Sequence, residues 1–334
     1  MELDAFVARH HAEWDRLHAL ATRRRRLSGA EADELVELYQ RTATHLSMVQ
    51  SSAPDPALVA RLSALVAEGR AAVTSASGSS LADVSRFVTV SFPSAVWRAR
   101  WWWIGVGVLT LLVSFCIGAW ISHNPDVVAS LASPEDLKQL VNQDFADYYT
   151  SNPAGSFAFK VWTNNAWVAA LALVGGSLFC LPGIYILWQN ALNIGVVGGL
   201  MAYAGKLDLF FGLITPHGLL ELTAVFVAGG AGLRLGWQII APGPRPRSVA
   251  LAEEGRSTLT IALGLVVVLL VSGLVEAFVT PSPLPTWARI LVGATVWIAF
   301  LAYITVFGRR AELAGDLGDV GDRAAITETL PYAG

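Results

Sequence analysis

Long apolar segments constrain this chain more than any other feature of its sequence. An α-helix needs about 20 residues to cross the hydrocarbon core of a bilayer, at a rise of about 1.5 Å per residue. The composition is that of a membrane protein, since 54% of the 334 residues are hydrophobic and 15% are charged. We therefore expect an all-α polytopic membrane protein with a transmembrane domain over 96–308. Six crossings are predicted, at about 101–122, 162–188, 189–205, 216–240, 258–280 and 287–308.

Basic residues predict the orientation of these helices. Lys and Arg collect in cytoplasmic loops of membrane proteins. In this chain they flank the first predicted helix, follow the fourth and follow the last: Arg86, Arg98, Arg100, Arg245, Arg247, Arg256, Arg309 and Arg310. The segment 123–160 is acidic, so it is expected to be an outer loop. Both termini, including a tail over 309–334, are then expected in the cytoplasm.

The third predicted crossing, 189–205, is inferred from the number of crossings that the charge rule requires. If this segment entered the membrane and returned, the next helix would carry Arg245 and Arg247 to the outside, against the charge rule. We therefore predict that it crosses, with a backbone interrupted by glycine and supported by neighbouring helices at the centre of the bundle. The polar and glycine residues that define this broken span are Asn190, Asn193, Gly195, Gly198 and Gly199.

Residues 1–95 contain no segment of spanning length and no apolar core of a signal peptide. Apolar residues recur there every three or four positions, which predicts three short helices. Ser28 with Glu31 predicts a capping box at the start of the second helix, and Asp55 precedes a proline that starts the third. We expect a cytoplasmic helical unit followed by an interfacial segment. Its small apolar core predicts docking on another surface. The run Arg23–Arg26 is either a solvated helix end or a site for anionic lipid.

Polar residues inside the predicted membrane segments define a candidate site. Under the predicted topology they lie at one level, in the outer leaflet, and intramembrane ionisable residues usually face protein or water. The members are His217, Glu221, Glu276, Asn164 and Asn165. A helical wheel places Ala228, Gly232 and Gly236 on the same face as His217 and Glu221, a stripe of small residues that lets a neighbouring helix approach closely.

Three interpretations of the His217–Glu221 pair remain open. The first is a structural pair hydrogen-bonded between helices, the second a pocket for a peptide, a lipid or a partner group, and the third a metal or catalytic site. The sequence favours the first, because "HGLLE" supplies one histidine where a zincin helix supplies two. Cys116 and Cys180 are expected as small buried residues without a disulfide. We find no cofactor, nucleotide or nucleic-acid motif, so no cofactor is expected.

Four stretches resemble the stage II sporulation protein M family of bacterial integral membrane proteins. They are "TNNAWVAALALVGG" from Thr163, "NALNIGVVGG" from Asn190, "PHGLLELTAVFVAGGAGLRLG" from Pro216 and "LVEAFVTPSPLP" from Leu274, within roughly 95–308. The resemblance implies an all-helical, non-enzymatic protein of the bacterial cell membrane, whose namesake scaffolds a peptidoglycan-degrading machine during engulfment. It also implies possible partners: a MoxR-type ATPase, a von Willebrand-like domain protein and an RDD-family membrane protein.

Two functions therefore follow as expectations. The first is a non-catalytic membrane scaffold for a cell-envelope assembly or remodelling complex, which contacts membrane lipids and protein partners and forms homo-oligomers through its glycine stripes. The alternative is a transporter or channel for a small solute or lipid, which would use the broken third span and the polar cluster. No nucleic acid partner is expected.

Overall fold

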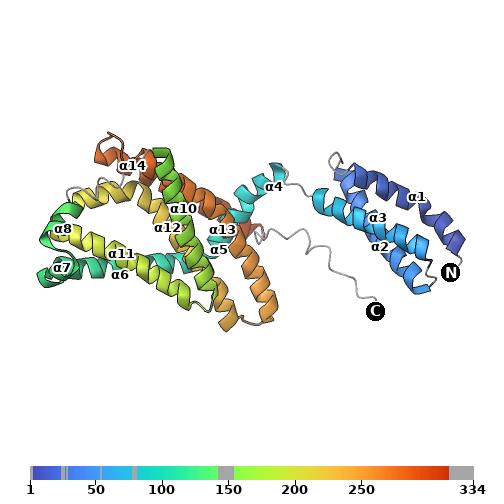
Figure 1. The fold of residues 1–334 in the computed structure, drawn as a ribbon, viewed down its shortest axis with the longest axis horizontal. Helices are drawn as coiled ribbons and strands as arrows, with labels where there is room; N and C mark the ends of the chain where they lie inside the picture. Colours follow the sequence, from blue (N-terminus) through green and yellow to red (C-terminus); the bar gives the residue numbers. More distant parts are fainter. Residues whose placement is uncertain are drawn as a thin grey trace. The chain divides into compact units, whose positions relative to one another are not determined.

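The computed structural model describes residues 3–23, 27, 29–52, 55–76, 81–141 and 154–315. Within these ranges the chain forms α-helices and short π-helical stretches, and no β-strand. The chain folds into two compact units, Met1–Val84 and Ser85–Gly334, each with its own helices (Figure 1). The protein is thus an all-α protein, and its second unit carries the helices long enough to span a membrane.

The N-terminal unit is a three-helix bundle of α1 (Leu3–Thr22), α2 (Gly29–Ser52) and α3 (Pro56–Ala76). The backbone N–H of Leu58 donates to Asp55 Oδ1 at 2.8 Å, which caps the start of α3. Ser28 and Arg24–Arg26 lie outside the described residues. Each of the three helices packs against the other two. The buried apolar core consists of Trp14, Leu17, Leu20, Ala21, Leu35, Leu38, Val49, Leu58, Leu62, Leu65 and Ala72.

The second unit begins at Ser85, before the predicted boundary at 95. Its first elements are α4 (Leu81–Arg86), which spans the boundary, the π-helical turn η2 (Phe87–Ser91) and α5 (Phe92–Arg98). The interfacial position of this segment stays a prediction, and in α5 Phe92 is buried against α13 and lies in contact with Gly264. A Cβ atom on Gly308 would meet the carbonyl of Pro93 at 2.6 Å. Helix α5 is therefore part of the bundle.

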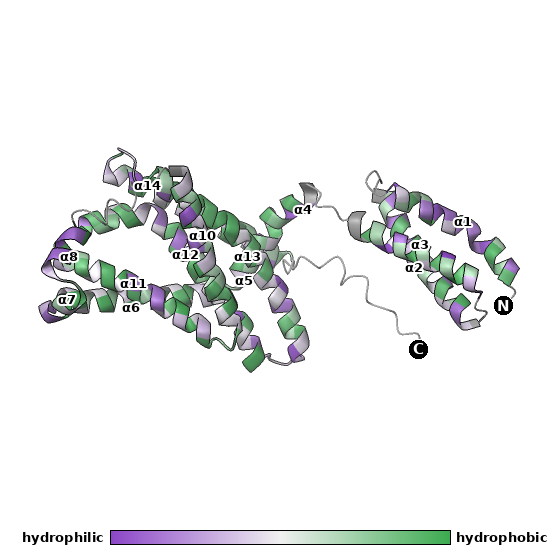
Figure 2. Cartoon of the chain, viewed as in Figure 1, coloured by the Kyte–Doolittle hydropathy of each residue, from purple (hydrophilic) through white to green (hydrophobic). Residues whose placement is uncertain are grey.

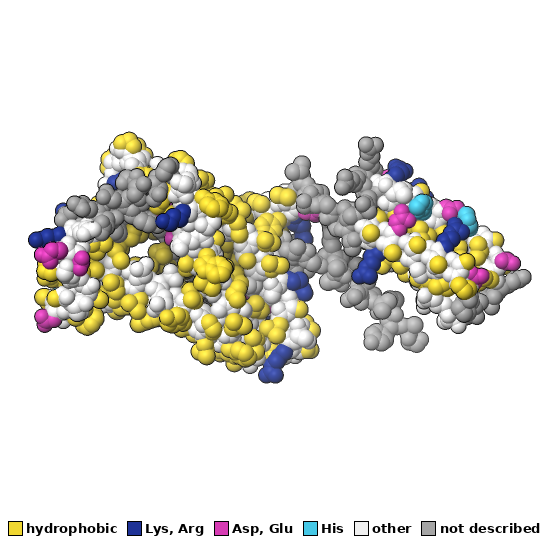
Figure 3. Space-filling model, in the orientation of Figure 1, with side chains coloured by type: hydrophobic (Ala, Val, Ile, Leu, Met, Phe, Trp, Pro, Cys, Tyr) yellow, Lys and Arg dark blue, Asp and Glu magenta, His cyan; other side chains and the backbone are white. Residues whose placement is uncertain are grey.

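Six long helices follow: α6 (Arg100–Ser122), α10 (Ala154–Ser177), α11 (Leu181–Tyr203), α12 (Leu207–Ile240), α13 (Arg247–Phe278) and α14 (Thr286–Leu313). Five of these described helices are long and apolar enough to cross a membrane, α10 being the exception. Lys160, Asn164 and Asn165 interrupt the apolar sequence of α10, so its crossing stays a prediction. Figure 2 shows that hydrophobic residues predominate along these helices, and Figure 3 shows hydrophobic side chains over much of the visible face of this unit.

The predicted second and third spans, 162–188 and 189–205, have the wrong boundaries. The second helix starts at Ala154, and the turn to the third lies at Leu178–Cys180. Phe179 and Cys180 adopt positive φ angles of 52° and 68° there. The hydropathy pattern misses this turn because its residues are as apolar as the helices that it joins.

The predicted break in the third span is also wrong, since α11 is one continuous helix. Its glycines serve close packing on α6: a Cβ atom on Gly195 would meet the carbonyl of Ser114 at 2.8 Å, and one on Gly199 would meet that of Gly118 at 3.0 Å. The Ser114 hydroxyl donates to the carbonyl of Ala191 at 3.0 Å. The predicted break includes three other residues. Asn193 is exposed, and Asn190 donates to the carbonyl of Ile186. Gly198 faces the ring of Phe210.

Helix α12 occupies the centre of the bundle and contacts α6, α10, α11, α13 and α14. Ala228, Gly232 and Gly236 are buried on it. Gly232 touches the backbone of Leu173, and Gly236 touches the carbonyl of Gly176, so this part of the small-residue stripe packs on α10. The predicted outer loop contains two short helices, α7 (Pro125–Leu131) and α8 (Pro134–Gln139), in its described part.

The substitution Gly232→Ala tests this packing. The new methyl group would overlap the Leu173 carbonyl oxygen, and overpacking of this kind costs about 1–3 kcal/mol. We expect a lower unfolding temperature of the purified protein in detergent. Gly105→Ala is the matched control, because a Cβ atom there meets nothing within 4 Å. Equal unfolding temperatures for the two variants would contradict the packing described for α12.

Candidate functional site

Three ionisable side chains meet where the first half of α12 crosses the last turns of α13. His217 and Glu221 lie one turn apart on α12, and Glu276 lies near the end of α13. One donor atom from each lies within 4.8 Å of the donor atoms of the other two. Glu221 presents a buried Oε2 with no hydrogen-bond partner among the described residues.

The surroundings of His217 fix its ring. Its Nδ1 lies 3.2 Å from the hydroxyl of Thr280, and its Nε2 lies 3.9 Å from Oε2 of Glu276. The three residues are buried within the protein, since His217, Glu276 and Thr280 are 6%, 4% and 0% exposed. The Ser272 hydroxyl donates to the backbone carbonyl of His217 at 3.2 Å.

A cation from α14 approaches this end of the bundle without pairing with the carboxylates. Arg289 donates from Nη1 to the carbonyl of Thr280 at 2.6 Å, and from Nη2 to the Thr286 hydroxyl at 3.1 Å. In the described part of the chain, Arg289 forms no ion pair with Glu221 or Glu276. The arrangement thus presents one imidazole and two carboxylates that face one another, with Arg289 engaged elsewhere.

Asn164 and Asn165, predicted as members of the cluster, do not belong to the buried group. Asn164 is exposed, and its amide donates to Asn165 Oδ1 at 3.1 Å. The reason is the start of α10: because the helix begins at Ala154, the two asparagines lie roughly 15 Å along it by helical rise, near its middle. The sequence pattern places them at the helix end, because it starts this helix too late.

Two polar neighbours of this cluster, Ser272 and Thr280, are not among the residues predicted from the sequence. Ser272 lies four residues before Glu276 on α13, so these two share one face of that helix, and Thr280 lies in the turn just after the helix ends at Phe278. This spacing is a usable signal, because a polar face within an apolar helix marks the side turned toward protein.

A second polar contact joins the same two helices and is also missed by the sequence pattern. Arg234 of α12 pairs with Glu254 of α13 at 3.0 Å, and their side chains are 16% and 6% exposed. From the sequence alone, the position of Arg234 near the end of its helix predicts a side chain that extends to the lipid headgroups. Glu254 lies before the predicted start of its span at 258. In the structure α13 begins at Arg247, which brings Glu254 inside the bundle.

A double-mutant cycle tests the Arg234–Glu254 pair. Removal of one member of a buried ion pair costs about 3–5 kcal/mol, because the other charge stays buried without its partner. We expect Glu254→Leu and Arg234→Leu each to lower the unfolding temperature strongly, and the double variant to regain most of the loss. Thermal unfolding in detergent measures this. Additive losses in the double variant would show that the two charges do not act as a pair.

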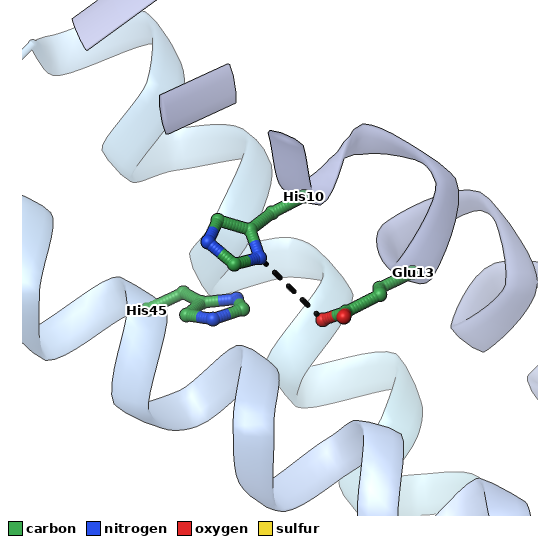
Figure 4. Close-up of side chains that lie close together, drawn as sticks. All are labelled: His10, Glu13 and His45. Carbon is green, nitrogen blue, oxygen red and sulfur yellow. Dashed lines mark ion pairs between the residues drawn. The ribbon is translucent and has the colours of Figure 1, made fainter. Parts of the chain in front are cut away.

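The N-terminal unit holds a second polar group, which Figure 4 shows: His10 and Glu13 of α1 and His45 of α2. His10 Nδ1 lies 3.6 Å from Oε2 of Glu13, and the centres of the two imidazole rings are 4.1 Å apart. Trp14 donates from its indole N–H to His45 Nδ1 at 3.2 Å. Burial, with a smaller contribution from His10, lowers the pKa of His45 below its ordinary value. His45 is therefore a neutral core residue at neutral pH.

These helices and the buried cluster define a polytopic, all-helical membrane protein. The chain belongs to the stage II sporulation protein M family, whose model matches residues 107–281 and includes His217, Glu221 and Glu276. A domain of unknown function (DUF8413) matches residues 4–75, which correspond to the three-helix bundle.

One curated relative is an uncharacterized protein of Methanocaldococcus jannaschii. It is 27% identical over 152 residues, which cover 45% of this chain and 84% of the relative. No solved structure matches the chain. The resemblance noted from the sequence is thus confirmed at the level of the family.

Proposed function

We propose that this family member is a non-catalytic membrane scaffold for a cell-envelope assembly or remodelling complex. The observation that carries the proposal is the closed packing around α12, where Gly232 and Gly236 lie in direct contact with the backbone of α10. Backbone contacts of this kind hold helices in one arrangement. A rigid bundle suits a protein that positions partners.

The transporter alternative has less support. It relied on a broken third span, and α11 is continuous. A hollow of about 130 Å³ between α6 and α11 is lined by apolar side chains, among them Val106, Leu109 and Leu187, with Thr110 as a polar member. A path for a polar solute requires convergent polar groups along its length. The hollow offers a surface for lipid instead.

The N-terminal unit is the proposed docking part. Its exterior carries exposed polar contacts, such as the ion pair of Arg16 with Glu34 at 2.7 Å and the contact of His18 with Glu68 at 2.8 Å. Figure 3 shows charged side chains spread over the visible face of this unit. Charge complementarity selects partners and speeds their association. From the family resemblance we propose a MoxR-type ATPase, a von Willebrand-like domain protein or an RDD-family membrane protein as the partner, and homo-oligomers are compatible with the proposal.

Co-purification of the tagged full-length chain after crosslinking in native membranes tests the scaffold role. We expect a defined set of membrane and cytoplasmic proteins. The double substitution Asp33→Lys and Glu37→Lys, at exposed positions of α2, should strongly reduce the amount of any captured partner that docks on this unit, because the substitutions reverse the local charge. Glu135→Lys in α8 is the matched control and should leave capture unchanged. Capture of no partner by the native chain would contradict the scaffold role.

The scaffold proposal also requires both termini in the cytoplasm. A variant without Cys116 and Cys180 serves as the background for single cysteines at exposed positions Ser130 and Ala252. A membrane-impermeant maleimide should label position 130 in intact cells, and position 252 only after the membrane is opened, because basic loops stay inside. The reverse pattern would invert the topology and place the docking unit outside.

A further inference from the structure

We propose that His217, Glu221 and Glu276 bind one divalent transition-metal ion, of the class of Zn²⁺, between α12 and α13. The ion is structural and ties the two helices together where their polar faces cross. This inference goes beyond the scaffold function and does not depend on it, since a metal clamp within the bundle is compatible with any partner.

The donor set and its spacing fit such an ion. One imidazole nitrogen and two carboxylate oxygens suit Zn²⁺, Mn²⁺ or Fe²⁺. Metal–ligand bonds of about 2.0–2.2 Å in a tetrahedral site place donor atoms roughly 3.4 Å apart. Here the donors lie within 4.8 Å of one another, so small rotations of the two glutamate side chains bring all three onto one ion. Water or a backbone carbonyl completes the coordination.

The hydroxyl that contacts Nδ1 suits His217 to metal binding. Metal-ligating histidines almost always donate their second ring N–H to a neighbouring acceptor, which fixes the tautomer. Thr280 Oγ1 lies 3.2 Å from Nδ1 and can accept that proton when the ring is protonated at Nδ1. Nε2 then presents its lone pair on the side of Glu276, 3.9 Å from the carboxylate. Thr280 thus acts as a positioning residue for the ligand.

The charge of the cluster gives an independent reason. Two carboxylates lie within the bundle, and an unpaired buried charge or polar atom is costly. Oε2 of Glu221 has no hydrogen-bond partner in the part of the chain that the structure describes. An arginine at this end of the bundle, Arg289, is engaged with the carbonyl of Thr280 and the hydroxyl of Thr286. A divalent cation neutralises both carboxylates and supplies a partner for Oε2 of Glu221.

The second group, His10, Glu13 and His45, has a similar composition and lacks this arrangement. Trp14 donates to Nδ1 of His45, so the ring proton of His45 sits on Nε2 and no lone pair is presented there. Arg41 also lies 3.7 Å from a carboxylate oxygen of Glu13. These contacts show that His45 and Glu13 are engaged by other side chains of the bundle. The group serves as an internal control.

The experiment measures metal in the full-length protein, purified in detergent through a tag without histidine. The protein is stripped with a chelator, loaded with Zn²⁺ and desalted, and its zinc is counted by mass spectrometry. We expect about one zinc per chain for the native protein, as for a single site. His217→Gln and Glu276→Gln should each reduce the bound zinc about tenfold or more, because each removes a ligand. His45→Gln should retain it.

Two further measurements protect the test against misfolding. Co²⁺ replaces Zn²⁺ in such sites and gives visible absorption bands that report its ligands, so the native chain should show bands that His217→Gln lacks. Thr280→Val keeps all three ligands, and we expect it to fold with zinc affinity reduced about 10–100-fold, as for other residues that orient a ligand. A native chain without zinc, or undiminished zinc in well-folded His217→Gln, would overturn the proposal, whatever partners co-purify.

Discussion

The structure depends on how closely neighbouring backbones approach α12. In lipid, helices gain no hydrophobic free energy from association, so their contacts depend on shape and on hydrogen bonds. Gly232 and Gly236 remove the side chains that would separate α12 from α10, and Gly293 allows α14 to touch the carbonyl of Pro216. Each of these neighbours is therefore held at a defined height on α12. Helix α10 also packs on α13, so the same contacts help to bring the last turns of α13 level with His217.

Polar side chains then set the register of α12 against α13. The His217 group lies in the first half of α12, and the Arg234–Glu254 pair lies toward its other end. A slide of one helix by a single turn, about 5.4 Å, would break both contacts at once. Since a buried charge without its partner is costly, the two contacts together exclude the neighbouring registers. By contrast, α6 and α11 meet mainly through glycine and apolar residues, with Ser114 as a polar exception.

The class of fold, the family and the three ionisable residues of the cluster can be predicted from the sequence, because apolar length and rare charges within apolar segments are strong local signals. The turn at Phe179 and Cys180 cannot, since it is as apolar as its surroundings. Glycines at 195 and 199 suggest a break in the pattern, although in a membrane they also permit close packing. An error in one helix start is enough to misplace Asn164 and Asn165. Side-chain contacts across helices, such as Thr280 with His217, depend on register, which no local pattern contains.

The two histidine groups show why composition alone does not define a site. Each combines imidazole with carboxylate within a few ångströms, and each is partly or fully buried. At His45 the indole of Trp14 points its N–H at the ring, which leaves that nitrogen without a proton and puts the proton on the other. At His217 the contacting atom is the hydroxyl of Thr280, which can accept a proton from Nδ1, so that the lone pair of Nε2 faces the carboxylate. An indole donor beside one imidazole and a hydroxyl that can accept beside the other suit the two rings to different roles, a packed core residue at His45 and the proposed metal ligand at His217.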